Sequence, residues 1–402
     1  MSIATEPGGG NGGSSWINDP KTRSIVFQVA LVVLFVALVA WLANNTMTNM
    51  ARLGTRLSYS YLGENAGYPI SPALIEYSVS ASSYGRALVV GLLNTLLAAG
   101  IGLVFATILG FIIGIARLSS NWLIAKIAQV YIEIFRNIPP VLQLMFWYAL
   151  MRTPMPDPKN SFVFFNVAYL NKRGLYLPSL NFGDGSILIL LALLVAIAVT
   201  VFLVRRARKL QAETGRRPRV IFLSLALLIG LPVIAFLAAG MPITANIPVH
   251  AGFNIGPTTG PNAVLALGPE LIGIVFGLSI YTAAFIAEIV RGGIRSISHG
   301  QTEAARGLGL TNGQNLRLVT VPQAVRVIIP PLTNQYLNLT KNTSLGHFIG
   351  YADLTLVNET AMNQSQHTIE GMSIVMLIYL IISIITSILM NWFNKRVALV
   401  ER

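Results

Sequence analysis

The sequence predicts an all-α integral membrane protein with about eight transmembrane helices. Hydrophobic residues make up 54% of its 402 residues and charged residues only 11%, whereas soluble domains carry about 25% charged residues. A soluble surface of this size cannot be built from so few charges. Long stretches without a formal charge locate the helices, because a helix needs about 20 apolar residues to cross a bilayer.

Six apolar segments are long enough to be transmembrane helices. They are 25–43, the uncharged stretch between Arg86 and Arg117, 186–204, 220–239, 271–289 and 372–392. Two further segments, 122–150 and 321–350, are apolar enough to enter the membrane but contain charges and a pair of prolines each. Proline removes a backbone hydrogen bond and bends a helix, which lipid tolerates only where protein or water satisfies the freed carbonyl. We expect these two helices to line a path.

The distribution of basic residues predicts the orientation. Eight helices place both termini on one side, and with the N-terminus inside, 18 of the 28 Lys and Arg residues lie in cytoplasmic segments and seven lie outside. This positive-inside pattern also explains the net charge of +13 without a nucleic-acid partner. The densest group, RRARKLQAETGRRPR at 205–219, either serves this orientation alone or binds anionic lipid headgroups.

Two short helices are predicted in the cytoplasmic loop SHGQTEAARGLGLTNGQNLRLVTVPQA at 298–324. Ser298 and Gln301 have the spacing of a capping box, and Gly307 and Gly309 end the helix that starts there. A second start signal follows, in which Thr311 and Gln314 repeat that spacing before Pro322 opens the next membrane helix. On this pattern alone, the loop is either a capped surface helix or a helix that fits a partner's groove.

The residues of this loop resemble the EAA loop of permeases from binding-protein-dependent ABC importers. The shared pattern is EAA at 303–305, Gly309 and VTVP at 319–322, with valine at 319 and 321 where isoleucine and leucine are usual. Three other blocks, YIEIFRNIPPVLQ (131–143), TAAFIAEIVRGGI (282–294) and PPLTNQYLNLTKNTSLGHFIGYADL (330–354), are similar to polar amino-acid permeases of the histidine/glutamine type. The whole chain resembles the larger permease subunit of bacterial general L-amino-acid or glutamate/glutamine/aspartate/asparagine importers.

The resemblance implies a core of five transmembrane helices, to which this chain adds one N-terminal and two inserted helices. The expected division is a disordered cytoplasmic tail at 1–23, an extra helix and outer loop at 24–86, the first half of the permease core at 87–150, an insertion at 151–269, the second half of the core at 270–395 with the EAA loop at about 291–320, and a cytoplasmic tail at 396–402. The outer loops of the insertion are rich in Gly, Pro, Ser and Asn, and loops of that length are either functional or poorly ordered.

The resemblance also implies the partners. The helix around Glu303, Ala304, Ala305, Gly309 and Pro322 would dock on one of two cytoplasmic ATPase subunits, beside a second permease subunit in a heterodimer. A periplasmic binding protein would deliver the amino acid, and the complex would lie in the bacterial inner membrane.

Several functions are excluded by what the chain lacks. None of its lysines follows a glycine, so it has no phosphate-binding P-loop, and ATP and Mg²⁺ belong to the ATPase partner. The four histidines show no metal-ligand spacing, there is no cysteine, and no GxSxG motif supports an enzyme. We expect a transport protein without bound cofactor or metal.

The candidate substrate site is the polar segment near the end of the 321–350 helix. Asn334, Asn338 and Lys341 are spaced i, i+4, i+7 and so share one helix face. Lys341 can bind the α-carboxylate of an amino acid while nearby amides and hydroxyls donate hydrogen bonds. The candidates are Gln143, Asn334, Asn338, Lys341, Asn342, Thr343 and Ser344. The alternative is that Lys341 pairs with Glu133, Glu288 or a carbonyl as a structural brace.

At position 342, relatives that carry basic amino acids often have aspartate. Because this chain has Asn342, the resemblance implies a pocket less biased toward cationic substrates. Elsewhere, Glu133 with Arg136 and Glu288 with Arg291 have the spacing of local ion pairs.

We therefore expect a permease that imports amino acids by alternating access. One alternative is a secondary transporter driven by an ion gradient, which needs acidic or histidine relays in mid-membrane, and the six clear helices have none there. The other alternative is a membrane scaffold that does not transport and only recruits an ATPase.

Overall fold

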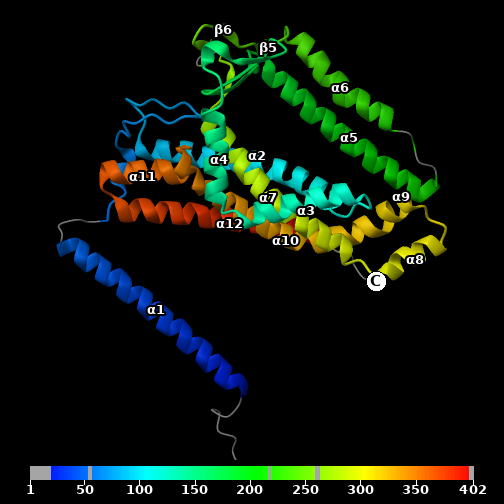
Figure 1. Ribbon diagram of the computed structural model, residues 1–402, viewed down its shortest axis with the longest axis horizontal. Helices are drawn as coiled ribbons and strands as arrows, with labels where there is room; N and C mark the ends of the chain where they lie inside the picture. The colour runs from blue at the N-terminus through cyan, green and yellow to red at the C-terminus, as the bar shows by residue number, and fades with distance from the viewer. Residues whose placement is uncertain (1–19, 53–56, 216–217, 219, 259–262, 398–402) are drawn as a thin grey trace, which may run out of the picture.

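The computed structural model describes residues 20–52, 57–215, 218, 220–258 and 263–397 (Figure 1). The α-helices are α1 Pro20–Arg52, α2 Tyr84–Ala116, α3 Trp122–Asn137, α4 Pro140–Arg152, α5 Ser186–Thr214, α6 Ile221–Ala238, α7 Pro269–Arg295, α8 His299–Gly307, α9 Asn312–Asn315, α10 Val321–Asn342, α11 Leu354–Ser365 and α12 Thr368–Val397. Shorter helical segments are η2 Ser60–Gly63, η3 Pro158–Asn160, the π-helical η4 Leu316–Thr320 and the 3₁₀ segment η5 Thr343–Ile349.

Six of these helices are long and apolar enough to cross a membrane, namely α1, α2, α5, α6, α7 and α12. They coincide with the six clear segments predicted from the sequence, so the helical membrane class is confirmed. The helix α1 begins at Pro20, so residues 20–23 are helical rather than part of a disordered tail. The remainder of that predicted tail, 1–19, lies outside the described residues, as do 398–402 at the other end.

The two proline-bearing segments differ from each other. Segment 122–150 is divided into α3 and α4, because Ile138 before Pro139 takes the extended conformation that proline imposes on its predecessor. Pro140 then starts α4 at the first helical position, where a missing N–H is not needed. In contrast, α10 stays helical through Pro330 and Pro331 and passes directly into η5.

The core is organised around α7, which packs against α2, α4 and α10 (Figure 1). Glycines allow this close approach. A Cβ built on Gly110 of α2 would lie 2.6 Å from the side chain of Ile286, and one built on Gly277 of α7 would lie 2.6 Å from Leu144 of α4. Such distances are shorter than van der Waals contact, so these positions require glycine for the helices to touch.

Outside the helices, the loops of the insertion contain short antiparallel strands that the sequence pattern did not predict. Four strands, β1 Phe162–Phe164, β2 Ala168–Asn171, β3 Gly174–Leu177 and β8 Leu265–Leu267, form one sheet in that order. Two-stranded ribbons pair β4 Ser179–Phe182 with β5 Ile243–Asn246, and β6 Val249–Ala251 with β7 Asn254–Gly256. These strands join the two halves of the insertion into one small β-structure beside the helix ends.

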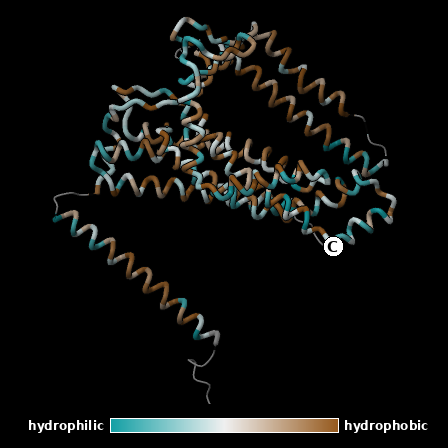
Figure 2. Tube along the Cα trace, viewed as in Figure 1, coloured by the Kyte–Doolittle hydropathy of each residue, from teal (hydrophilic) through white to brown (hydrophobic). Residues whose placement is uncertain are grey.

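Two regions of the chain stand away from the helical core on opposite sides in Figure 1. One is α1, and the other is the hairpin of α5 and α6, whose helices pack on each other. Figure 2 shows these three helices as predominantly hydrophobic along their length. Because their apolar side chains are exposed on the isolated chain, lipid or another membrane protein must cover them.

Candidate functional site

A polar stripe lies on the exposed face of α10. Asn334, Asn338 and Lys341 are all exposed, as their helical spacing predicts, and Val327 and Pro330 continue the same face toward the start of the helix. Among the described residues, the side chains of Asn334, Asn338 and Lys341 have no hydrogen-bond or ion-pair partner. The opposite face of α10 is buried against the core through residues such as Leu332 and Leu339.

The structural brace considered for Lys341 is not present among the described residues. Glu288 is instead paired with Arg291 through both carboxylate oxygens, with Nε of Arg291 2.9 Å from Oε2 of Glu288. Glu133 accepts a hydrogen bond of 2.6 Å from Gln129 rather than pairing with Arg136. The Glu288 pair predicted from spacing is therefore confirmed, and the Glu133–Arg136 pair was wrong, because the arginine lies over the ring of Phe285 instead.

The next candidate residues are only partly available to a ligand. Thr343 is fully buried and donates its hydroxyl to the carbonyl of Thr340 at 2.7 Å. Ser344 donates to the carbonyl of Lys341 at 2.8 Å. Asn342 is half-buried beside Lys341. Of the predicted set on this segment, the structure thus brings Asn334, Asn338 and Lys341 together on one open face and turns Thr343 inward.

Gln143 has a structural task that its sequence position did not reveal. Its side chain is buried, and its Nε2 donates to the carbonyls of Phe135 and Ile138, at 2.9 Å each. These carbonyls belong to the end of α3, where the prolines remove the usual backbone donors. Gln143 therefore stabilises the break between α3 and α4, and it does not join the stripe on α10.

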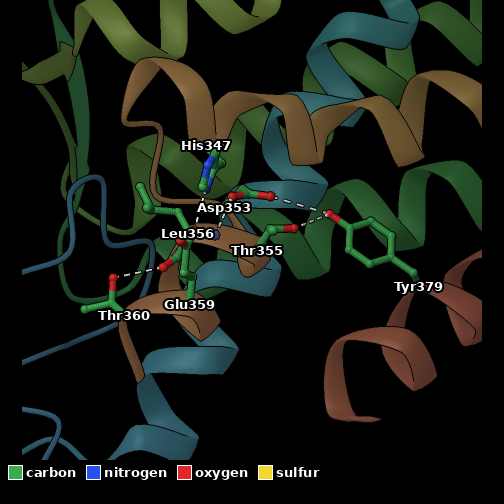
Figure 3. A network of polar contacts seen from close by, with 7 residues as sticks. All are labelled: His347, Asp353, Thr355, Leu356, Glu359, Thr360 and Tyr379. Carbon is green, nitrogen blue, oxygen red and sulfur yellow. Dashed lines mark hydrogen bonds and ion pairs between the residues drawn. The ribbon is translucent and has the colours of Figure 1, made fainter. Parts of the chain in front are cut away.

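A polar network lies around the start of α11, in the segment that follows α10 and η5. Figure 3 shows Asp353 at its centre, where one carboxylate oxygen accepts from the backbone N–H of Leu356 at 2.9 Å and so caps α11. The other oxygen lies 3.5 Å from the hydroxyl of Tyr379, which also contacts Thr355. Burial is the main reason that the pKa of the Asp353 carboxyl is raised to about 6. In the same view, Nδ1 of His347 lies 2.6 Å from a carboxylate oxygen of Glu359.

Buried polar residues of α2 hold the same loop from the other side. Asn94 donates to the carbonyl of Ala352 at 2.9 Å and accepts through its own carbonyl from the hydroxyl of Tyr351 at 2.8 Å. The neighbouring Thr95 accepts from the N–H of Leu354 at 3.0 Å. This pair was not predicted, although two adjacent polar residues in an otherwise apolar helix were a visible signal.

The two short helices after α7 form as the sequence predicts. Ser298 is the N-cap of α8, although its side chain makes no capping hydrogen bond. Gly309 has a φ of +77°, a left-handed conformation that favours glycine, and it follows the end of α8 directly. The second box is complete, since Thr311 and Gln314 exchange both capping hydrogen bonds at the start of α9.

This loop presents one exposed surface and one connection to the stripe helix. Glu303 and Ala304 are exposed while Ala305 is buried, so α8 presents two of its three EAA residues on one side and packs the third against the chain. The amide of Gln323, in the first turn of α10, donates to Gln301 of α8 at 3.1 Å. The segment η4 and this hydrogen bond therefore join α8 to α10.

Comparison with known proteins matches a family model, the binding-protein-dependent transport system inner membrane component, to residues 213–399. The match includes α8, α9 and η4, which together (residues 298–320) are called the α8–α9 loop below, and it also includes α10. Three relatives align along nearly the whole chain. The general L-amino acid transport system permease protein of Rhizobium johnstonii is 48% identical over 100% of this chain and 99% of its own length.

The putative amino-acid ABC transporter permease protein of Escherichia coli is 46% identical, covering 97% of this chain and 98% of the relative. The glutamate/glutamine/aspartate/asparagine transport system permease protein of Rhodobacter capsulatus is 40% identical, with both chains covered completely, at 100% each.

Proposed function

The chain belongs to the family of binding-protein-dependent transport system inner membrane components and is a permease of an amino-acid ABC importer, and we propose that it carries polar and general L-amino acids into the cytoplasm by alternating access. The energy would come from ATP hydrolysis in separate subunits. This chain would bind neither ATP nor Mg²⁺, and it would itself catalyse no reaction.

The observation that carries the proposal is the polar stripe of α10. Asn334, Asn338 and Lys341 are exposed within a chain whose long exposed helical faces are mostly apolar. A lysine or asparagine side chain facing lipid is strongly unfavourable, so such residues face protein or a water-filled path. A path between this chain and a second permease subunit satisfies both conditions.

The stripe has the groups that an amino acid requires. The ammonium of Lys341 supplies the charge opposite to an α-carboxylate, and the amides of Asn338 and Asn334 can each donate and accept hydrogen bonds. Asn342 adjoins them. Ser344 would contribute only acceptor lone pairs, because its hydroxyl proton is bound to a backbone carbonyl. The fully buried Thr343 would support the site from behind, through its hydrogen bond to the Thr340 carbonyl. The amide protons of Gln143 are occupied at the helix break, so only its Oε1, which has no hydrogen-bond partner among the described residues, would accept a hydrogen bond from the amino acid.

The coupling surface is the exposed side of the α8–α9 loop. Leu308 is 82% exposed and Leu318 61% exposed, beside the exposed Glu303 and Ala304. Apolar side chains of this size at the tip of a polar loop are typical of a surface that a partner covers. In this proposal that partner is a cytoplasmic ATPase subunit, and Gly309 and Pro322 fix the turn and the start of α10 that connect the surface to the path.

The proposed arrangement has both termini in the cytoplasm of a bacterial cell and the complex in its inner membrane. The α8–α9 loop and the ends of α5 and α12 then lie on the cytoplasmic side. The loop of Asp353 and the β-structure of the insertion lie outside, where a periplasmic binding protein would deliver the amino acid. A secondary transporter driven by an ion gradient, the alternative from the sequence, has no such use for the α8–α9 surface.

The test replaces Lys341 by methionine in the complete complex of both permeases, ATPases and binding protein, reconstituted in vesicles. Lys341→Met preserves the length of the side chain and removes its charge. Loss of a charge-assisted hydrogen bond should raise the substrate concentration for half-maximal uptake by about tenfold or more. Lys126→Met, at the start of α3 and away from the stripe, is the matched control and should transport normally.

Unchanged uptake by Lys341→Met in an assembled complex would contradict the proposal that Lys341 binds the substrate. Uptake that persists without ATP would instead favour the secondary transporter. A rate of ATP hydrolysis that does not change when the binding protein and amino acid are added would favour the scaffold.

A further inference from the structure

The helices α5 and α6 enclose a crevice that the transport mechanism does not use. It has a volume of about 230 Å³ and lies between the end of α5 and the start of α6. At about 30 Å³ for each water molecule, it has room for roughly eight waters, enough for a phosphate and part of a glycerol. Its lining residues are Val204, Ala207, Arg208, Val220, Ile221, Ser224, Leu225 and Leu228.

Ser224 is the first sign that the crevice holds a ligand. The residue is only 8% exposed, and its hydroxyl has no hydrogen-bond partner among the described residues. Buried hydroxyl groups are normally hydrogen-bonded, because an unpaired one loses its water contacts without replacement. A ligand acceptor in the crevice would satisfy this hydroxyl.

Arg208 indicates that the ligand is negatively charged. It lines the same crevice, and none of the carboxylates that the structure describes forms an ion pair with it. Arg205, Arg206 and Lys209 are also exposed on this end of α5, whereas Glu213 is engaged with Lys209 at 3.9 Å. The site is therefore electropositive, with one guanidinium suited to the paired oxygens of a phosphate.

The other walls require that the ligand have an apolar part. Five of the remaining lining residues are valine, isoleucine or leucine. Figure 2 shows α5 and α6 as mostly hydrophobic, and many of their apolar side chains are exposed. Where lipid covers these side chains, acyl chains contact them, and the basic end of α5 then lies at the level of the lipid headgroups.

We propose that this crevice is a binding site for one anionic phospholipid. Arg208 and the hydroxyl of Ser224 would bind the phosphate, and the apolar walls would receive the glycerol and the first methylene groups of an acyl chain. Because this end of α5 is cytoplasmic in the proposed orientation, the lipid belongs to the inner leaflet. The site depends on this hairpin and not on the amino-acid path, so each can fail without the other.

The experiment measures lipid binding to the full complex, purified in detergent, by native mass spectrometry. The probes are dioleoylphosphatidylglycerol, dioleoylphosphatidylcholine and inorganic phosphate. Arg208→Gln should weaken phosphatidylglycerol binding by on the order of tenfold, and Ser224→Ala should weaken it in the same direction. The matched control is Arg206→Gln, at a nearby position on the opposite side of α5, which should change binding by about twofold at most.

Three results would overturn the site. Equal weakening by Arg206→Gln and Arg208→Gln would reduce the effect to general attraction by the basic helix end. Equal affinity for phosphatidylcholine would remove the preference for anionic lipid. Displacement of the lipid by inorganic phosphate would mean that only the phosphate is recognised and the apolar walls are unused. Ser224→Ala keeps the proposal testable if the Arg208 variant does not assemble.

Discussion

Asp353 is a buried ionisable residue at the end of the molecule opposite the α8–α9 loop. Its carboxyl has a pKa of about 6 in the folded chain and an ordinary value of 3.8, mainly because burial disfavours the charged form. Between these two values the folded chain binds more protons than the unfolded chain. The contribution of Asp353 to stability is therefore highest below about pH 4, falls as the pH rises to 6, and stays low above it.

The first prediction follows from this sign. Asp353→Asn keeps an oxygen to cap α11 but cannot ionise, so it should remove a pH-dependent difference of about 2.4 kcal/mol between pH 4 and pH 7. The measurement is thermal unfolding of the purified complex across that range, for wild type and variant in parallel. His347 and Glu359 lie nearby, and both are present in wild type and variant alike. Parallel curves for the two proteins would show that Asp353 is charged throughout and that burial does not raise its pKa.

The spacing of residues along the sequence predicted the polar stripe, but it did not predict the role of Gln143. The i, i+4, i+7 spacing of Asn334, Asn338 and Lys341 follows from helix geometry alone, so their common exposed face was accessible from sequence. The contacts of Gln143 depend on where α3 ends, and the exact break at Ile138 depends on tertiary packing. For the same reason, spacing alone did not decide between an ion pair for Arg136 and the ring of Phe285.

At the scale of elements, glycine positions determine how close α2 and α7 come. A Cβ on Gly110 would meet the side chain of Ile286 at 2.6 Å and the carbonyl of Ala283 at 3.0 Å. On the same helix, a Cβ on Gly100 would have nothing within 4 Å. The two glycines thus form a matched pair within one element.

The second prediction uses that pair. Gly110→Ala should destabilise the complex by roughly 1–3 kcal/mol through overpacking, whereas Gly100→Ala should be neutral or stabilising by up to about 1 kcal/mol through helix propensity. Thermal unfolding of the two variants against wild type measures both. If the two substitutions changed the unfolding temperature equally, the close contact between α2 and α7 at Gly110 would be contradicted.

The third prediction concerns the link between α8 and α10. Gln323→Leu removes the 3.1 Å hydrogen bond to Gln301, and a net contribution of about 0.5–1.5 kcal/mol should lower amino-acid uptake per ATP hydrolysed by up to roughly tenfold. Gln301→Leu should have the same effect, and the double variant should lose no more than either single one. Gln211→Leu, on the exposed end of α5, is the control. Additive losses in the double variant would show that the two glutamines act separately.

Helical elements were easier to predict than the strands of the insertion. Long uncharged stretches and capping boxes are local signals, and they gave the six membrane helices as well as the starts of α8 and α9. The strands are only three or four residues long, and β3 pairs with β8 about ninety positions later. Alternation over so few residues is no signal, and their pairing depends on how the inserted helices bring the loops together.

At the scale of the whole molecule, the proposed coupling surface and the loop of Asp353 lie at opposite ends of the helical core. The α8–α9 loop lies at one end of the helical core and α11 at the other, with α10 running between them (Figure 1). Composition predicted that the chain crosses a membrane, but it did not predict that α1 and the α5–α6 pair would stand outside the core. Their packing partners are lipid or other chains, which leave no pattern in a helix that is hydrophobic on every side.

The central claim is that the α8–α9 loop faces the cytoplasm and is covered by an ATPase subunit. The chain has no cysteine, so a single Ala304→Cys substitution reports on this surface alone. Phe165→Cys, at a side chain that is 96% exposed on the opposite side of the proposed membrane, is the control.

The measurement is labelling with a membrane-impermeant maleimide in spheroplasts and in inverted vesicles. We expect that Ala304→Cys reacts only in inverted vesicles, and that bound ATPase protects it, while Phe165→Cys reacts only in spheroplasts. Labelling of Ala304→Cys in intact spheroplasts, or reactivity that the ATPase leaves unchanged, would contradict a cytoplasmic coupling role for this loop.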